Sequence, residues 1–217
     1  MRNAKLTSRL RALASVVLVA GLLSPVVATA QSASPANAAG PPNSLPRPLS
    51  REERVRWFLN ATVNPKSLGA GVISAAWSTG LNNPEEYGPH WGGFAKRYGM
   101  RLTGIATNNA IEAGLGSVWG EDPRYTRVGE GNIWSRIRNA ARMTVLAERA
   151  DGSTAPAYAR YAAISSGSFL SNTWRVDSDS TAGAALRRTG LGFAGRFASN
   201  VFEELWPDLR RKLFSRK

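Results

Sequence analysis

The chain contains no cysteine and only one histidine among its 217 residues. The lack of cysteine excludes disulfide bonds, thiolate metal sites, a cysteine nucleophile and lipid attachment at a processed cysteine. A single histidine excludes a metal site built from several histidines of one chain. Stability must therefore come from packing, and we expect neither a metal nor a cofactor.

Acidic residues are also few, since 28 Lys and Arg face 15 Asp and Glu and give a formal net charge of +13. The first 30 residues hold no acidic residue and four basic ones, which are Arg2, Lys5, Arg9 and Arg11. An apolar run follows, and the small residues Ala28-Thr29-Ala30 match a signal-peptidase site. The sequence therefore predicts that residues 1–30 are a signal peptide. If this segment is not cleaved, the same run becomes a membrane anchor.

Without the predicted signal the chain still carries a net charge of +9, because the signal accounts for four of the positive charges. In a cytosolic protein this excess would indicate nucleic acid, but export removes that partner. We expect the protein in the periplasm or cell envelope, with an anionic lipid or a cell-wall polymer as its partner. The alternative is that the basic residues only keep the surface soluble.

Residues 31–49 are rich in Pro, Ala and Ser and predict a flexible linker. Residues 50–217 are expected to form one domain with a basic C-terminal end. Ser50, Asn64-Pro65, Asn83-Pro84 and Pro156 are helix-start signals, Pro89–His90 marks a restart, and Gly120-Glu121-Asp122-Pro123 is a stop. The expected helices include Trp91–Val118, Ile133–Arg149, and a last helix that Asp177 and Asp179 cap and Pro207 bends.

These signals predict a mainly α fold, a compact bundle of about five to six helices that is rich in small residues. Arg124–Val128 is the best candidate for a short strand. No predicted helix combines the length and apolarity of an ordinary membrane span. On the last helix, mostly small residues recur at every fourth position, and they form the face Ala182, Leu186, Gly190, Ala194 and Ala198. Such a face favours close packing of helices, either within the bundle or between two copies of the chain in a homo-oligomer.

Several tryptophans lie next to arginine in the sequence, a composition typical of a membrane headgroup interface. The alternative is that the rings fill a core of small residues while arginine stems cover them. The candidates for envelope contact are Trp57, Trp134, Trp174 and Trp206, together with the basic residues Arg210, Arg211 and Lys212.

His90 is the one imidazole that could act as a general base, with Glu86 or Glu112 as the carboxylate that orients it. On one straight helix His90 and Glu112 would be about 33 Å apart, so a dyad needs a break in that helix. Arg97, Arg101 and Asn108 form a polar stripe between them. The alternative is that His90 caps a helix.

Two further patterns favour structural roles. Glu121-Asp122 and the pair Asp177 and Asp179 could offer oxygen ligands to a hard cation, but such pairs more often serve turns and helix caps. A G-x-G-x-x-G match at residues 190–195 lacks the preceding strand of a dinucleotide site.

We therefore expect a non-enzymatic, exported helical protein that acts as a structural or interaction component at an anionic membrane or cell-wall surface. The competing hypothesis is a small exported hydrolase or lyase that uses His90 with a nearby carboxylate.

Overall fold

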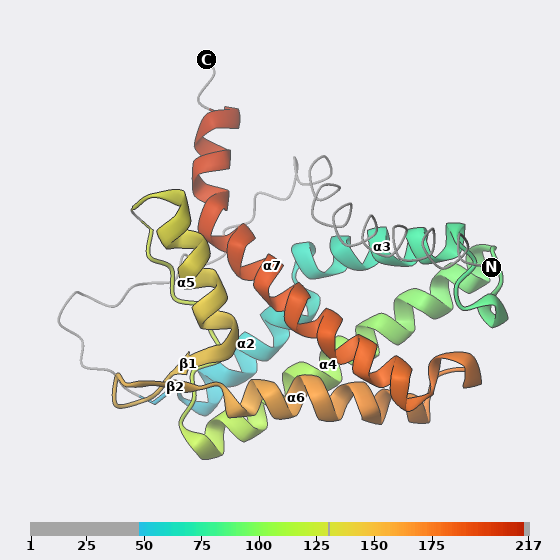
Figure 1. Ribbon diagram of the computed structural model, residues 1–217, viewed down its shortest axis with the longest axis horizontal. Helices are drawn as coiled ribbons and strands as arrows, with labels where there is room; N and C mark the ends of the chain where they lie inside the picture. Colours follow the sequence, from blue (N-terminus) through green and yellow to red (C-terminus); the bar gives the residue numbers. More distant parts are fainter. Residues whose placement is uncertain (1–47, 130, 215–217) are drawn as a thin grey trace, which may run out of the picture. The chain divides into compact units, whose positions relative to one another are not determined.

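The computed structural model of the chain describes residues 48–129 and 131–214 (Figure 1). These residues belong to one compact unit, Gly40–Lys217. They form a mainly α fold, which confirms the predicted fold class. The predicted signal peptide and all but the last two residues of the predicted linker lie outside the described residues.

The first two helices begin at the predicted caps. Helix α2 spans Arg51–Val63, and Ser50 and Glu53 form a capping box in which each side chain accepts a hydrogen bond from the other residue's backbone N–H. Helix α3 spans Pro65–Gly80 and is capped by Asn64, whose side-chain oxygen accepts from the backbone N–H of Ser67. Proline at the first position of α3 sacrifices no helical hydrogen bond.

Helix α4 is one unbroken helix, Trp91–Trp119, preceded by the 3-10 turn η1, Glu85–Tyr87. His90 caps its start, and Gly120 ends it in the left-handed conformation with a φ of 69°. Glycine inside a helix costs about 1 kcal/mol relative to alanine, so tertiary contacts must stabilise α4. Gly93 supplies one such contact, because a Cβ there would lie 2.5 Å from the Tyr87 carbonyl oxygen.

Helix α5 spans Ile133–Val145 and ends before the predicted Arg149. The chain then forms a two-stranded antiparallel hairpin of β1, Leu146–Glu148, and β2, Thr154–Pro156, with Leu146 opposite Pro156. The early end has a physical cause, because the Arg160 guanidinium donates to the carbonyls of Met143, Thr144 and Leu146. These bonds replace the helical ones that the carbonyls would otherwise accept.

The strand predicted at Arg124–Val128 is wrong, since this segment has no strand partner. Its extended backbone is instead held by a carboxylate. The backbone N–H groups of Val128 and Gly129 donate to the Glu204 carboxylate at 3.4 and 3.0 Å. A buried side chain thus satisfies the donors that a neighbouring strand would have satisfied.

Helix α6, Tyr158–Leu170, leads through the 3-10 turns η2, Ser171–Thr173, and η3, Asp177–Asp179, to helix α7, Ala182–Phe214. The predicted caps at Asp177 and Asp179 are wrong: Thr181 accepts from the backbone N–H of Ala184 and starts α7. Helix α7 continues past Pro207. The Glu204 carbonyl, in the turn before Pro207, accepts a hydrogen bond from Arg136.

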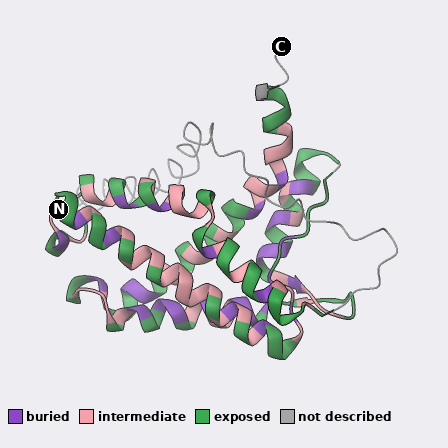
Figure 2. Cartoon of the chain, turned by 180° about the vertical axis from the view of Figure 1, so that it is seen from behind, coloured by how far each residue is buried: buried purple, intermediate pink, exposed green. Residues whose placement is uncertain are grey.

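Helix α4 packs against α2, α3 and α6, while α7 packs against α5 and α6 (Figure 1). The buried positions along these contacts, seen in Figure 2, hold alanines and charged residues more often than large apolar ones. The bulkiest fully buried side chains are Arg160 and Glu204, each 1% exposed. Among the described residues, no helix is both long enough and apolar enough to cross a membrane.

Candidate functional site

His90 acts as the cap of α4. Its Nδ1 accepts a hydrogen bond from the backbone N–H of Gly93 at 3.2 Å. Neither a hydrogen bond nor an ion pair joins His90 to Glu86 in the described structure. The partner of the Glu86 carboxyl is Ser178, and this hydrogen bonding holds the pKa of Glu86 below its usual value. The arrangement matches the alternative in which His90 caps a helix rather than the one in which it acts as a base.

Glu112 lies far from His90 because α4 has no break between them. Twenty-two residues of continuous helix separate the two positions by about 33 Å. The Glu112 carboxylate is buried and accepts from Arg160 Nε at 3.0 Å and from Arg196 at 3.2 Å. The structure therefore does not bring His90 together with Glu112.

The polar stripe of α4 does not converge on one site. Arg97 is buried and donates to the carbonyls of Asn83, Pro84 and Gly88, which fastens the turn before α4. Its guanidinium also lies over the Tyr87 ring, 5.5 Å from the centroid.

The other two residues of the stripe serve neighbouring helix contacts. Burial lowers the pKa of the Arg101 guanidinium, which lies beside Gly71 of α3. Asn108 faces Gly167 of α6, where even a Cβ would overlap its side-chain oxygen. The stripe thus contributes to three separate packing contacts.

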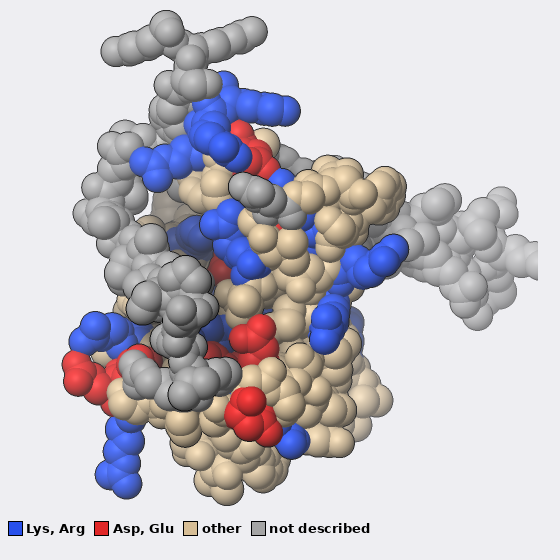
Figure 3. Space-filling view, turned by 90° about the vertical axis from the view of Figure 1, so that its left-hand side faces the viewer, with Lys and Arg blue, Asp and Glu red and all other residues tan. Residues whose placement is uncertain are grey.

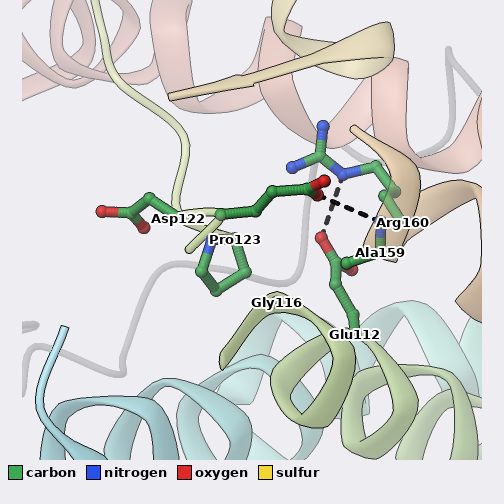
Figure 4. A pocket seen from close by; sticks show the side chains of 7 residues that line it. Glu112, Gly116, Asp122, Pro123, Ala159 and Arg160 are labelled. Atoms are coloured by element: carbon green, nitrogen blue, oxygen red, sulfur yellow. Dashed lines mark hydrogen bonds and ion pairs between the residues drawn. The ribbon is translucent and has the colours of Figure 1, made fainter. Parts of the chain in front are cut away.

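A cluster of buried charges joins α4, α6 and α7 around the segment after α4 (Figure 4). Glu112 pairs with both Arg160 and Arg196, and Arg196 donates to the Pro123 carbonyl at 2.5 Å. Burial and the nearby Arg196 lower the pKa of Arg160 to about 10, which still leaves it charged at neutral pH. Asp122 points away from the Glu112–Arg160 pair (Figure 4) and binds Arg124 instead.

The hollow beside this cluster encloses about 150 Å³ of space outside the atoms, none of it wide enough for a water molecule. Glu121, which lines it, accepts from the backbone N–H groups of Tyr158 and Ala159 at 3.1 and 3.0 Å. It therefore caps α6, whose own cap residue, Ala157, has no side-chain acceptor. The cluster is a packing device rather than a substrate site.

A second buried cluster joins α5 and α7 through Glu204. Its carboxylate accepts from the Tyr125 hydroxyl at 2.7 Å and from Arg136 Nε at 3.4 Å. Burial and this hydrogen bond raise the pKa of the Tyr125 hydroxyl. Arg136 also pairs with Asp208, and hydrogen bonds from Arg136 and Arg211 hold the pKa of Asp208 below its usual value.

The acidic pairs do not assemble a cation site. Asp179 is surrounded by the guanidinium groups of Arg175, Arg187 and Arg188. Within residues 48–129 and 131–214, no group of three potential ligands is placed to hold a metal ion.

Many large apolar side chains are exposed. Trp91 is 84% exposed and Trp134 is 73% exposed, and exposed aliphatic residues occur on every α-helix of the described part. The small-residue face of α7 is also exposed at Leu186, Gly190 and Ala194. Homo-oligomerisation through this face stays a prediction.

Exposed basic and apolar side chains occur together where α5 begins and α7 ends. The ion pair between Arg136 and Asp208 places the first turn of α5 beside this part of α7. We call this surface the basic–aromatic end; it consists of the exposed residues Arg127, Val128, Ile133, Trp134, Arg138, Leu209, Arg210, Arg211 and Lys212. Basic side chains dominate the molecule near the end of α7 in Figure 3.

Of the residues that the sequence suggested for envelope contact, this end unites Trp134 with Arg210, Arg211 and Lys212. Trp206 is partly buried and stacks on Phe202, with ring centroids 5.1 Å apart.

Trp57 and Trp174 are likewise only partly exposed, and the indole N–H of Trp174 is buried. Sequence reasoning missed Ile133 and Arg138. The spacing of Trp134 and Arg138, four residues apart on a predicted helix, is the signal that could have found the second of them.

Comparison with known proteins finds no matching family model, no matching curated protein and no matching solved structure.

Proposed function

We propose that this chain is an exported, non-enzymatic interaction protein that attaches to an anionic membrane surface through its basic–aromatic end. One observation carries the proposal: Trp134 is 73% exposed in the first turn of α5, and the Arg136–Asp208 ion pair joins that turn to the part of α7 that carries the exposed residues Arg210, Arg211 and Lys212. The predicted signal peptide and the positive charge of the chain place such a surface where anionic lipid is available.

The physical chemistry of this surface favours a bilayer over other anionic partners. Each Lys or Arg near an anionic membrane contributes about 1 kcal/mol, so five of them attract the end to the bilayer appreciably. Tryptophan and aliphatic side chains are stabilised at the headgroup–acyl boundary of a bilayer, where Ile133, Trp134 and Leu209 would bury their apolar surface. A cell-wall polymer offers charge but no apolar phase, and export removes nucleic acid as a partner.

The pairing of Asp208 at this end supports the same interpretation. Asp208 is engaged by Arg136 and by Arg211 within the described structure. Arg210 and Lys212 have no carboxylate within ion-pair distance there, so their charge is available to headgroups.

The buried charged residues have structural roles that explain their burial without a catalytic role. Glu112, Glu121 and Glu204 each accept hydrogen bonds that hold two or more elements together. His90 serves as a helix cap. Two of the three candidates of the hydrolase hypothesis, His90 and Glu112, thus have structural roles, which favours the interaction protein.

Fractionation of cells that produce the full chain tests the proposal. We expect the protein in the membrane pellet at low salt and its release by high salt, because the contact is largely electrostatic and screened. The variant R210Q/R211Q/K212Q should move to the soluble fraction at low salt.

The matched control is R51Q/R56Q/K96Q, which removes three exposed charges away from the basic–aromatic end. It should stay in the pellet. Recovery of the unaltered chain in the soluble fraction at low salt, or equal behaviour of the two triple variants, would contradict the proposal.

A further inference from the structure

A hollow of about 380 Å³ opens between Trp119, Arg149 and Tyr158. Among the described residues, its walls come from the last position of α4, the turn after β1 and the first position of α6. These elements meet at the hairpin end of the fold (Figure 1). The volume lies within the range of small-molecule sites, and two aromatic side chains supply most of the wall.

Glu121 fixes all three walls of this hollow. Its carboxylate accepts from the backbone N–H groups of Tyr158 and Ala159, and its backbone pairs antiparallel with Arg149. It follows Trp119 by two residues, across the left-handed Gly120. Because Glu121 is 3% exposed and held by these bonds, the walls are positioned without a ligand. A preorganised site of this kind binds at a lower entropic cost.

Arg149 differs from the buried arginines of this fold. The buried arginines all donate to backbone carbonyls; they are Arg54, Arg97, Arg136 and Arg160. The described structure shows no hydrogen-bond acceptor for the guanidinium of Arg149, which is only partly buried. Its Nε is shielded from solvent and has no partner. Because Arg149 lines the hollow and its guanidinium has no acceptor among the described residues, an acceptor in the hollow would meet an unpaired cation.

We propose that the hollow binds a small organic monocarboxylate with a flat apolar body. The guanidinium would take the carboxylate through parallel N–H···O bonds, and the Trp119 and Tyr158 side chains would cover the apolar part. One arginine matches one negative charge, whereas a doubly charged phosphate monoester would bring a second charge without a partner. This site is independent of the basic–aromatic end, because it lies at the opposite end of α5, beyond Val145.

A carboxylate of the following turn, Asp151, interacts electrostatically with Arg149. Asp151 accepts from the backbone N–H of Ser153 at 2.8 Å. This hydrogen bond is the main reason that the pKa of Asp151 lies below its usual value, and Arg149 contributes less. Asp151 therefore reduces the positive potential at the hollow without occupying the guanidinium.

Titration calorimetry with 1-naphthoate and the full chain, without lipid, tests this proposal. We expect saturable binding at one site, with at least tenfold weaker binding to R149Q, equivalent to about 1.4 kcal/mol. The control K96Q removes an exposed positive charge elsewhere on α4 and should bind like the unaltered chain. Absence of saturable binding, or equal affinity for R149Q, would overturn the proposal.

A second comparison uses the unaltered chain and so does not depend on the folding of any variant. The neutral analogue 1-naphthalenemethanol should bind at least tenfold more weakly than 1-naphthoate, because it cannot pair with the guanidinium. Equal binding of the two probes would show an apolar surface without an anion site and would also overturn the proposal. Neither outcome bears on membrane attachment, since no vesicles are present.

Discussion

At the scale of the residue, four buried arginines carry out tasks that hydrophobic side chains cannot perform. Three of them, Arg54, Arg97 and Arg160, donate to backbone carbonyls in loops or near helix ends, and Arg136 donates to the Glu204 carbonyl in the turn before Pro207. Carbonyls in loops and at helix ends lack helical partners and must be satisfied when they are buried. Alanines fill the space around these long side chains, which explains why a core with so few large apolar residues can still pack closely.

The Glu112→Gln variant tests this view of the interior. It would leave Arg160 and Arg196 buried or half-buried without their shared carboxylate. Breaking a buried ion pair in this way should lower the free energy of unfolding by about 3–5 kcal/mol. Urea denaturation measures the change. Glu52→Gln, which breaks an exposed pair with Arg56, should change it by less than about 1 kcal/mol, and an equal loss in both variants would contradict the prediction.

The Asp208→Asn variant should alter how stability depends on pH. Hydrogen bonds from Arg136 and Arg211 lower the pKa of Asp208 in the folded protein, so its carboxylate contributes stability above the unfolded pKa. That contribution is lost as pH falls through the lower, folded pKa. We therefore expect the variant to be less stable than the unaltered chain at neutral pH, and the difference to shrink below about pH 4. Urea midpoints across this range check the prediction; a difference that is constant with pH would refute it.

At the scale of the element, the sequence was most informative where local chemistry decides the outcome. The capping residues Ser50 and Asn64 and the restart at His90 start helices as predicted. The wrong cap at Asp177 and Asp179 missed a local acceptor, Thr181, whereas the other two wrong predictions involve long-range contacts. Arg160 ends α5 early, and Glu204 holds the segment that resembled a strand. No local pattern signals a partner that lies tens of residues away in the chain.

Glycines of α4 provide a paired test at this scale. Gly93→Ala would place a Cβ against the carbonyl oxygens of Tyr87 and Gly88, so the turn before α4 would have to shift and the protein should lose stability. Gly99→Ala meets nothing within 4 Å and should stabilise the protein by about 0.5–1 kcal/mol, the usual gain inside a helix. Urea denaturation of both variants measures the two changes. Stabilisation by Gly93→Ala would refute the close approach.

At the scale of the whole molecule, many buried positions hold charged side chains while many large apolar side chains are exposed; Figure 2 shows how the buried positions are distributed along the helices. The sequence predicted the helices and proposed Trp134 and the basic C-terminal residues as contact candidates. It could not predict that Arg136 and Asp208 would bring them to one end, because their pairing joins residues 72 positions apart. The same limit explains why the hollow at Trp119 was not foreseen, since its walls come from three elements.

Co-sedimentation of the purified chain with lipid vesicles tests the central claim most directly. The account predicts binding to phosphatidylcholine vesicles that contain about 30% phosphatidylglycerol, and little binding to phosphatidylcholine alone, because the basic residues require anionic headgroups. Trp134→Ala and R210Q/R211Q/K212Q should each weaken binding, whereas Trp91→Ala and R51Q/R56Q/K96Q should not. All variants share the same N-terminal 47 residues, so their differences report on the basic–aromatic end. Binding that is equal for all variants, or equal for both kinds of vesicle, would contradict the account.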